Sequence, residues 1–597
     1  MSDITVAELL ARQAAERPNR PAITAPDGTT VTYGELAGRA ADTTETLHWA
    51  GFGRGDRVAL ALPGGADMAA VLVSVMHGAV AVPLDSSCGV EELAGYLKAA
   101  GARAVVVDLE APAGAVEAAE SLGLALLATS GGEPPRLVHG ARSPVVRELP
   151  EGDDDALVLH TSGTTGHRKV VPLQQTGVVL SARNIAAGLA LTEEDRCLNA
   201  LPLFHAHALL TPLLATLSAG GEVVCLPRFE SGRFLAALRT FQPSWYSAVP
   251  TVHQAILRDA RDLDGVRLRF VRSASAPLPE RVSRLIEETF RAPVIEAYGM
   301  TETTSVVASN PLPPAGRKPG SVGLPIGCEI AVLDEEGRPL PPGQVGEVAV
   351  RGRAVARGQA GADGWFHTGD LGRRDEDGYL FLAGRTKEIV NRGGVTVSPF
   401  ETDQVVQACP GVAQAVAFPV PHPTLGEDLV VAVVPEPGAA LTEGDVRRFA
   451  MARLRRAMVP SRVVIVDDIP KAPNGKVQRL RLHEQIPLPA ARFSAPVGET
   501  QAELVAIWRQ VLGVDRVGAR DNFFDLGGDS LAAARLCELV AARTGAQVST
   551  VDVFAFPTVT AFAEFLQDRV DADNVRADNV RAGRGRLARL RGGKDAR

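Results

Sequence analysis

Residues 57–108 read RVALALPGGADMAAVLVSVMHGAVAVPLDSSCGVEELAGYLKAAGARAVVVD. Apolar runs of strand length alternate in this segment with amphipathic stretches of helix length. Such alternation is typical of a mostly parallel sheet whose crossover connections are helices. The same rhythm returns between Glu222 and Tyr298, so we predict an α/β fold for the large N-terminal part of the chain.

The sequence pattern changes twice after this part. From about Pro311, short apolar runs separated by Gly and Pro turns favour an antiparallel or β-barrel-like element. A small α+β unit with a helix predicted over 442–456 follows Lys387, and then the aperiodic stretch EQIPLPAARFSAPVGE (484–499) indicates a linker. Three segments with helical periodicity then predict an all-α domain of the four-helix type. The predicted boundaries are 1–385 for the large N-terminal part, 386–487 for the small C-terminal part, 488–498 for the linker, 499–571 for the helical domain and 572–597 for a basic, disordered tail.

The composition excludes several classes of function. The chain has 597 residues, of which 46% are hydrophobic and 22% charged, and its net charge is −8. This acidic balance argues against nucleic acid or an anionic membrane surface as the main partner. Only the tail is basic, because residues 576–597 contain eight Lys or Arg and two Asp, a net +6.

The compartment is indicated by what the sequence lacks. The six cysteines are scattered without a CxxC pair, so we expect neither a disulfide framework nor a zinc site. Such cysteine usage favours a cytoplasmic protein. The longest apolar stretch, 68–84, contains His77 and Pro83 and is too short to span a bilayer. Asp3 and Glu8 stand where a signal peptide needs a basic and then an apolar run, so we expect a short amphipathic helix at the N-terminus.

A Thr/Ser/Gly loop is the first candidate binding site. LVLHTSGTTGHRK (157–169) places this loop after an apolar strand and ahead of a helix-like stretch. Glycines let backbone N–H groups turn inward as an anion nest, hydroxyls add donors, and a lysine adds charge. The GxxGxxK spacing differs from the nucleotide loop GxxxxGK[ST], and for this loop alone a surface turn is an equal alternative. The candidate phosphate-binding residues are Thr161, Ser162, Gly163, Thr164, Thr165, Gly166 and Lys169.

Four further motifs narrow the alternatives. They are EAYGMTETT (296–304), GWFHTGD (364–370), GRTKEIVNRGG (384–394) and PKAPNGKVQR (470–479). With the loop, and in this order, they resemble the adenylate-forming superfamily of acyl-CoA synthetases, luciferases and nonribosomal-peptide adenylation domains. The resemblance covers residues 5 to 487 and makes 1–385 and 386–487 the two subdomains of an adenylation domain.

The resemblance implies ATP and Mg²⁺ as cofactors and a role for each matched residue. Tyr298 would stack on adenine, and Asp370, assisted by Arg385, would accept hydrogen bonds from the ribose hydroxyls. Thr301 would contact the α-phosphate region and Glu302 would ligate Mg²⁺. Lys476 would contact the substrate carboxylate and the α-phosphate, where its charge counters the repulsion between two anions.

The family also implies movement between two half-reactions. The small subdomain rotates about a hinge residue that matches Lys387. One orientation presents Lys476 for adenylation. The other presents Gly393 and Gly394, whose lack of side chains would let a pantetheine arm pass.

The helical domain carries a modification motif. DNFFDLGGDSL (521–531) lies between two helical segments and resembles the phosphopantetheine site of acyl and peptidyl carrier proteins. A GGDS sequence alone is more often a turn with an N-cap serine, but the FFxLGG context favours the carrier interpretation. Ser530 would then carry 4'-phosphopantetheine, attached by a phosphopantetheinyl transferase.

The activated acid is the least defined part of the interpretation. Relatives that activate amino acids have an Asp where LPLFHAHALL (201–210) has His205 and His207, so an ammonium partner is missing. The surrounding segments are most similar to oxalyl-CoA synthetases, except that Ser305 stands where a His is expected as the partner of a second carboxylate. We expect a small polar acid without a free α-amino group, and a structural role for one of the two histidines. The candidate pocket residues are His207, Ser273, Ser275, Met300 and Ser305.

The sequence therefore predicts an initiation didomain of natural-product biosynthesis. It would load a carboxylic acid onto its own Ser530 and deliver the thioester to a condensation, ketosynthase or tailoring enzyme. Three alternatives stay open: a ligase that uses free CoA, an adenylation-carrier didomain that activates an amino acid, and an inactive scaffold or carrier. A γ-phosphoryl-transferring NTPase is disfavoured, because the Walker spacing is absent.

Overall fold

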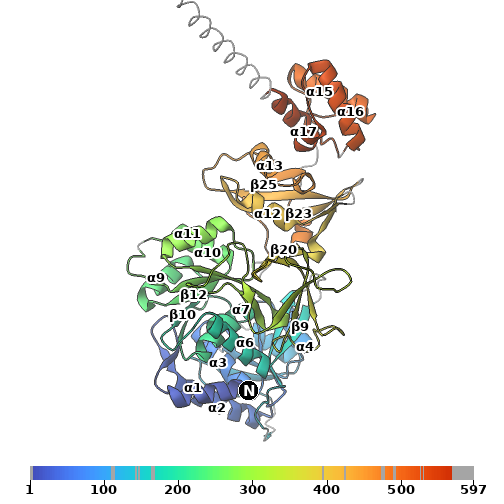
Figure 1. Ribbon diagram of the computed structural model, residues 1–597. Coiled ribbons are helices and arrows are strands. Elements are labelled where there is room, and N and C mark those ends of the chain that lie inside the picture. Colours follow the sequence, from blue (N-terminus) through green and yellow to red (C-terminus); the bar gives the residue numbers. More distant parts are fainter. Residues whose placement is uncertain are drawn as a thin grey trace, which may run out of the picture. The chain divides into compact units, whose positions relative to one another are not determined.

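The computed structural model describes residues 5–108, 114–140, 144–145, 148–162, 168–261, 263–392, 395–422, 425–471, 477–487, 493–524, 526–528 and 530–567. The chain divides into two compact units, Met1–Leu382 and Ala383–Arg597. In Figure 1 the elements are coloured in chain order, from blue at the N-terminus to red at the C-terminus.

The first unit contains a seven-stranded sheet in the order β7-β6-β5-β3-β4-β8-β9. Its inner strands are parallel, and the edge strands β7 and β9 are antiparallel to their neighbours. The predicted strands of residues 57–108 are three of its members, which confirms the α/β prediction. The strands are β3 (Arg57–Ala61), β4 (Val80–Pro83), β5 (Ala104–Asp108), β6 (Ala125–Thr129), β7 (Arg136–His139), β8 (Asp155–Ser162) and β9 (Arg168–Gln174).

A second, nine-stranded sheet of the same unit has the order β16-β15-β14-β13-β12-β10-β11-β1-β2. The strands from β14 to β1 are parallel, so their carboxyl ends share one edge, where ligands of open α/β sheets bind. The strands are β1 (Pro21–Thr24), β2 (Thr30–Thr32), β10 (Arg196–Asn199), β11 (Glu222–Cys225), β12 (Trp245–Ala248), β13 (Phe270–Ser273), β14 (Val294–Met300), β15 (Ser305–Ser309) and β16 (Leu324–Pro325).

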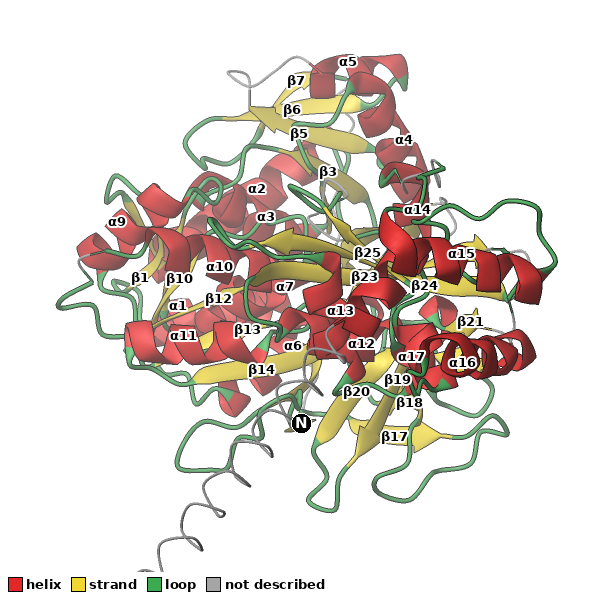
Figure 2. Cartoon of the chain, turned by 90° about the horizontal axis from the view of Figure 1, so that it is seen from above, coloured by secondary structure: helices red, strands yellow, loops and turns green. Residues whose placement is uncertain are grey.

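Helices form three layers around these two sheets. One apolar core joins both sheets to the helices between them, and two further cores lie under the outer helices of each sheet. Figure 1 shows α9, α10 and α11 together beside β10 and β12, and Figure 2 shows α4 and α5 beside β5 to β7. The inner helices are α1 (Val6–Glu16), α2 (Tyr33–Ala50), α3 (Ala66–Gly78), α6 (Gln175–Gly188) and the continuous run α7 (Ala206–Ala208), η1 (Leu209–Ala215) and α8 (Thr216–Ser218). The outer helices are α4 (Val90–Ala100), α5 (Gly114–Ser121), α9 (Ser231–Phe241), α10 (Pro250–Asp259) and α11 (Glu280–Phe290).

A four-stranded antiparallel sheet follows, in the order β17-β18-β19-β20. It corresponds to the element predicted from the Gly and Pro turns after residue 311. The strands are β17 (Glu329–Leu333), β18 (Gly346–Arg351), β19 (Phe366–Arg374) and β20 (Leu380–Arg385).

The second unit begins with a small α+β part. Its five-stranded sheet has the order β22-β21-β24-β23, with β25 parallel to β24. The helix predicted over 442–456 is shorter, because α13 is capped by Thr442 and ends at Met451. The elements are η3 (Thr386–Glu388), β21 (Val390–Arg392), β22 (Val395–Val397), α12 (Pro399–Gln407), β23 (Val412–His422), β24 (Gly426–Pro435), α13 (Glu443–Met451), η4 (Arg456–Met458), β25 (Arg462–Ile465), η5 (Arg479–Arg481) and α14 (Leu482–Gln485).

The C-terminal helical domain has a core of its own. Leu504, Trp508, Phe523 and Phe562 are fully buried in it. Two of the three predicted helices are α15 (Gly498–Leu512) and α16 (Ser530–Thr544), and residues 559–567 are helical as well. The short helix α17 (Thr550–Ala555) was not predicted, since its six residues are too few to show a helical period. The predicted tail 572–597 lies outside the described residues.

Two expectations about the whole chain can be compared with the structure. All six cysteines are free thiols. Among the helices of the described residues, none is both long and apolar enough to cross a membrane.

Candidate active site

Tyr298 and Asp370 form a buried pair in the first unit. The Tyr298 hydroxyl donates a hydrogen bond of 2.5 Å to Asp370 Oδ2. Tyr298 lies near the end of β14 and is 8% exposed, and Asp370 lies in β19 and is 5% exposed. The structure therefore brings together two of the three residues that the resemblance assigned to the adenosine of ATP.

A bulge in β19 sets the direction of Asp370. Ala349 pairs with His367 and Glu347 with Leu371, so three residues of β19 stand opposite one residue of β18. Gly369 takes a φ of 72°, which favours glycine, and its N–H donates to the Glu347 carboxylate at 3.0 Å. Bulges of this kind re-aim a side chain relative to the regular strand.

His367 holds the outer side of this bulge. Its Nδ1 lies 3.0 Å from Glu347 Oε2, and its Nε2 lies 3.0 Å from Asp363 Oδ2. Hydrogen bonds to Asp363 and then to Glu347 raise the pKa of His367. Because Glu347 contacts both His367 and Gly369, the charge of His367 is linked to the strand that carries Asp370.

A tight hairpin between β14 and β15 presents Thr301 and Glu302. A Cβ at Gly299 would lie 1.5 Å from the Ser305 carbonyl oxygen, so only glycine fits there. The 3₁₀ turn η2 (Thr301–Thr303) follows, and Thr304 and Ser305 take φ angles of 48° and 83°. Strained non-glycine residues of this kind gather at functional sites. The hairpin is anchored by the Glu302 carbonyl, which accepts a hydrogen bond of 2.8 Å from the Ala356 N–H.

Lys169, the last residue of the Thr/Ser/Gly motif, contacts this hairpin. Its Nζ lies 3.1 Å from Glu302 Oε1 and donates to Gln359 Oε1 at 2.8 Å. The described residues contain no group of three or more His, Cys, Asp or Glu that could hold a metal ion. The single hard carboxylate of Glu302 fits Mg²⁺, which binds through one or two carboxylates together with phosphates and water.

Most of the predicted phosphate-binding loop and several other predicted residues lie outside the described residues. Thr161 lies in β8 and pairs with Lys169 across the sheet. The structure does not describe the residues Gly163, Thr164, Thr165, Gly166, Gly393, Gly394 and Lys476, nor the side chains of Ser162 and Ser530.

His207 lies at the centre of a second polar cluster. It stands in α7, at the start of a helical run whose π-helical part contains Pro212. Its Nδ1 is 3.0 Å from Ser275 Oγ and its Nε2 is 2.7 Å from Ser247 Oγ. His207 and Ser275, predicted together as pocket residues, are thus in direct contact. Ser273 ends β13, and Met300 pairs with Ser305 across the β14–β15 hairpin.

The sequence reasoning missed Arg272. This residue pairs with Ser247 across β13 and β12 and is 1% exposed. Its Nη1 donates to Ser247 Oγ at 3.2 Å and lies 3.3 Å from His207 Nε2. An arginine inside the short strand FVRS (270–273) was the available signal, because an arginine is almost never fully buried unless it is paired.

An ion-pair network surrounds the predicted hinge in the second unit. Lys387 lies in η3, a turn that begins directly after Arg385 at the end of β20. The next residue, Glu388, accepts from Arg479 Nε at 2.9 Å, and Arg479 Nη2 donates to Asp403 at 2.7 Å. Arg479 stands three residues after Lys476, so it links the segment of the predicted catalytic lysine to the hinge turn and to α12.

Two glycines determine the backbone shape of the carrier motif. Gly527 takes a φ of 92°, and a Cβ at Gly528 would lie 2.4 Å from the Phe523 ring. Phe523 is itself held by a hydrogen bond of 2.7 Å from its N–H to the Pro557 carbonyl. This packed turn leads to Ser530, which is the first residue of α16.

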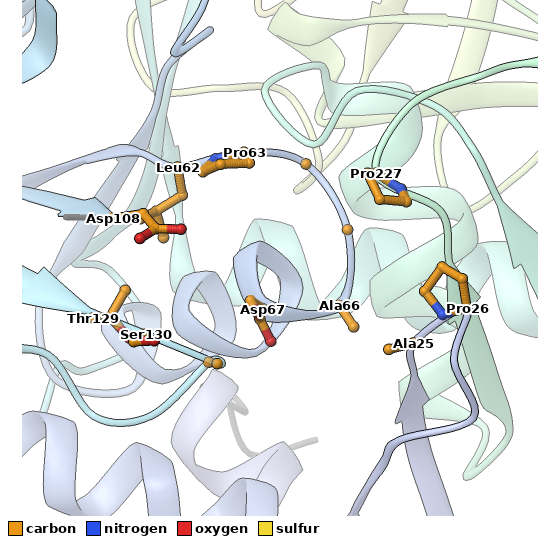
Figure 3. A pocket seen from close by; sticks show the side chains of 14 residues that line it. Ala25, Pro26, Leu62, Pro63, Ala66, Asp67, Asp108, Thr129, Ser130 and Pro227 are labelled. Atoms are coloured by element: carbon orange, nitrogen blue, oxygen red, sulfur yellow. The ribbon is translucent and has the colours of Figure 1, made fainter. Parts of the chain in front are cut away.

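A cavity of about 150 Å³ lies elsewhere in the first unit. Figure 3 shows Asp67 and Asp108 on its wall, together with Leu62, Thr129 and Pro227. None of the predicted site residues that the structure describes lines this cavity. Burial raises the pKa of Asp67.

Comparisons with known proteins match three parts of the chain. The family models described as AMP-binding enzyme, AMP-binding enzyme C-terminal domain and phosphopantetheine attachment site match residues 10–359, 401–476 and 502–566. The oxalate–CoA ligase of Arabidopsis thaliana is 41% identical over an alignment of 506 positions, and the match covers 80% of this chain and 98% of the relative. Novobiocin biosynthesis protein H of Streptomyces niveus is 31% identical over 600 residues, covering 94% of this chain and 95% of the relative. The crystal structure of ATP-bound MatB from Rhodopseudomonas palustris superposes with a TM-score of 0.72 at 30% identity, covering 81% of this chain and 99% of that one.

Proposed function

The chain belongs to the AMP-binding enzyme family, and from this premise we propose that it loads a small carboxylic acid onto its own carrier domain. It is an AMP-forming carboxylate ligase that uses ATP and Mg²⁺, and its C-terminal domain carries 4'-phosphopantetheine. The proposed part concerns the acceptor, the acid and the role of each residue.

In the first half-reaction, a carboxylate oxygen of the acid forms a bond to the α-phosphorus of ATP, and the bond from that phosphorus to pyrophosphate breaks. Tyr298, Asp370 and Arg385 would hold the adenosine. Glu302 would hold the magnesium ion, which neutralises phosphate charge, with Thr301 beside the α-phosphate. The ion pair of Lys169 with Glu302, at 3.1 Å, supports a shared site for the phosphates and the cation.

Lys476 would complete this half-reaction. Its ammonium group would approach both the substrate carboxylate and the α-phosphate, so its charge would stabilise the transition state in which two anions meet. The hinge at Lys387 would deliver this residue and later withdraw it.

In the second half-reaction, the pantetheine thiol on Ser530 attacks the acyl carbon of the acyl-AMP. A carbon–sulfur bond forms, the bond from the acyl carbon to the phosphate oxygen breaks, AMP leaves, and the thiol proton passes to the solvent. Gly393 and Gly394 would let the arm approach. The thioester would then serve a condensation, ketosynthase or tailoring enzyme.

One observation carries this proposal. Matches to both parts of an AMP-binding enzyme and to a phosphopantetheine attachment site occur in the same chain, and novobiocin biosynthesis protein H aligns over 94% of it. A carrier domain joined directly to the activating domain has a high effective concentration as acceptor.

The test is the intact mass of the phosphopantetheinylated protein after incubation with ATP, Mg²⁺ and single acids. The panel contains oxalate, malonate, glycolate, lactate, glycine and benzoate. A gain of one acyl mass is expected with a small acid and not with glycine. Ser530→Ala should abolish the gain, and the matched Ser494→Ala control in the same unit should retain it.

Free CoA is a second candidate acceptor. The 41% identity to a protein named oxalate–CoA ligase favours it. Pyrophosphate release without a mass gain on Ser530, together with an acyl-CoA product, would establish CoA as the acceptor and refute self-loading.

A further inference from the structure

Gln359 is a polar residue to which neither half-reaction assigns a role. Its Oε1 accepts a hydrogen bond of 2.8 Å from Lys169 Nζ, which also lies 3.1 Å from Glu302 Oε1. Three segments far apart in the chain thus meet at one ammonium group: β9, the turn η2 and residues 354–359. The side chain of Lys169 is 46% exposed, so its orientation depends on these two contacts rather than on burial.

The 354–359 segment is fixed to the same hairpin that carries Glu302. The Thr304 hydroxyl donates to the Ala354 carbonyl at 2.5 Å, and the Ala356 N–H donates to the Glu302 carbonyl at 2.8 Å. Ala354 and Ala356 are both buried. A turn follows, in which the Gln359 N–H donates to the Ala356 carbonyl at 3.2 Å. The backbone therefore places the glutamine beside the carboxylate before any ligand binds.

The same segment is also attached to the strands on the lysine side. Arg357 Nη2 donates to the carbonyl of Asp153, which lies just ahead of β8. Strand β8 pairs with β9, the strand that contains Lys169. None of these backbone attachments uses the Gln359 side chain. A substitution at Gln359 should therefore remove one side-chain acceptor and retain the arrangement of the segments around it.

A phosphate-binding lysine gains from acceptors of this kind. The ammonium group of a lysine has three N–H bonds. Two of those on Lys169 are directed to Glu302 and Gln359, which leaves one for a phosphate oxygen. A lysine side chain loses much rotamer freedom when it is fixed on a ligand. Two acceptors that fix it beforehand reduce this loss on binding, which is the effect of preorganisation.

The two acceptors differ in charge. Glu302 is a carboxylate and the proposed ligand of Mg²⁺, so the metal and the ammonium group interact with the same negative charge. The amide oxygen of Gln359 is neutral, and it can hold the lysine whether or not Glu302 binds the metal. Gln359 would thus keep Lys169 in place when the site contains magnesium and nucleotide together.

We propose that Gln359 is a positioning residue for Lys169, and that through this lysine it determines the affinity for the phosphates of ATP. The inference rests on the proposed function, because Lys169 serves the nucleotide of that same reaction. Gln359 itself contacts neither the acid nor the reacting phosphorus. Loss of its acceptor oxygen should hence weaken the binding of ATP and leave the KM for the acid unchanged.

The test is a double-mutant cycle of Gln359→Met and Lys169→Ala. Methionine retains the length of glutamine and removes its acceptor oxygen. Gln359→Met is expected to raise the KM for ATP in pyrophosphate release, and the Kd of α,β-methylene-ATP with Mg²⁺ by calorimetry, by about tenfold, the effect of a hydrogen bond to a charged group. Once Lys169→Ala has removed the ammonium group, Gln359→Met should change the Kd by less than about twofold.

The cycle separates positioning from folding. A substitution that merely loosened the 354–359 segment would weaken binding equally in the Lys169→Ala background. Gln344→Met is the matched control, because Gln344 lies in an exposed loop of the same unit, and it should retain the wild-type values. The half-saturating Mg²⁺ concentration should be the same in Gln359→Met as in the wild type. A higher value would make Gln359 a ligand of the metal and overturn the positioning role.

Each result decides the inference. An unchanged Kd in Gln359→Met, or an equal loss with and without Lys169, would overturn it. Pyrophosphate release without an acyl group on Ser530 would overturn only self-loading. If no acid gives pyrophosphate, the proposed function fails, and the calorimetric cycle with α,β-methylene-ATP still decides the role of Gln359. A wild-type protein that does not bind this analogue would overturn both the proposed function and the inference.

Discussion

The hydroxyl of Tyr298 lies 2.5 Å from a carboxylate oxygen of Asp370, and this bond joins the nine-stranded sheet to the four-stranded sheet of the first unit. Both side chains are buried, so neither can adjust without disturbing the other. A nucleotide that stacks on the tyrosine and binds the carboxylate through its ribose would meet two groups that are already oriented. Such preorganisation lowers the entropy lost on binding.

Removal of the Asp370 charge should therefore weaken ATP binding. Asp370→Asn is expected to raise the KM for ATP by about 10- to 100-fold, because a charge-assisted acceptor is lost. Tyr298→Phe retains the ring, loses one neutral donor, and should raise the KM by roughly fivefold. Pyrophosphate release at varied ATP measures both values. Tyr96→Phe is the control, since Tyr96 bonds to Glu92 within α4. An unchanged KM for Asp370→Asn would contradict the ribose assignment.

Glu302 should determine the requirement for magnesium. Glu302→Gln retains the size of the side chain but loses a hard anionic ligand, so we expect kcat to fall about 100-fold and the half-saturating Mg²⁺ concentration to rise. The measurement is a magnesium titration of pyrophosphate release, with chelation by EDTA abolishing activity. Glu335→Gln, in an exposed turn, should behave as wild type. The assignment of Glu302 is wrong if its glutamine variant has the wild-type magnesium dependence.

His367 should make the first unit more stable at mildly acidic pH. Its folded pKa is raised above the unfolded value by Asp363 and Glu347, so its contribution is fully present below the unfolded pKa and is lost as the pH rises through the folded pKa. His367→Gln should thus lower the melting temperature at about pH 6 and have a smaller effect at about pH 8.5. The comparison is made with His139→Gln, which lies on the surface. An equal loss at both pH values would exclude a role of the imidazolium.

Arg479 should be more important for folding than Lys476. Loss of its side chain in Arg479→Ala leaves the carboxylates of Asp403 and Glu388 without their ion-pair partner, which we expect to destabilise the small α+β part by about 3–5 kcal/mol. Hydrogen exchange of α12 and β23 measures this loss locally. Arg479→Lys retains the charge without the planar fork and should recover only part of the protection.

Lys476→Ala provides the contrast. It should abolish formation of acyl-AMP, retain hydrogen-exchange protection, and leave transfer from preformed acyl-AMP to Ser530 largely intact. Both half-reactions are followed by mass spectrometry. Equal loss of both steps would contradict the role assigned to Lys476.

Much of the first unit could be predicted from local patterns. The run from Arg57 to Asp108 shows its strands and helices because short apolar runs and amphipathic stretches are properties of neighbouring residues. The boundaries were less accurate, as for α13, whose predicted end lies five residues too far along the chain. The short helix α17 was missed, since its formation depends on packing against α16 rather than on its own period.

The candidate site, like the fold, was predictable from the sequence only in part. The sequence by itself determined the fold class, the order of the motifs and the chemical types of residue in each, because these depend on the order of side chains along the chain. Only the tertiary structure decided which of them meet: Tyr298 with Asp370, Lys169 with Glu302, and Arg272 with His207. Those contacts join residues 65 to 133 positions apart, and such long-range pairs arise from strand order and burial, which no local pattern records. Arg272 was overlooked for this reason, since a buried cation is recognised as unpaired only when its surroundings are known.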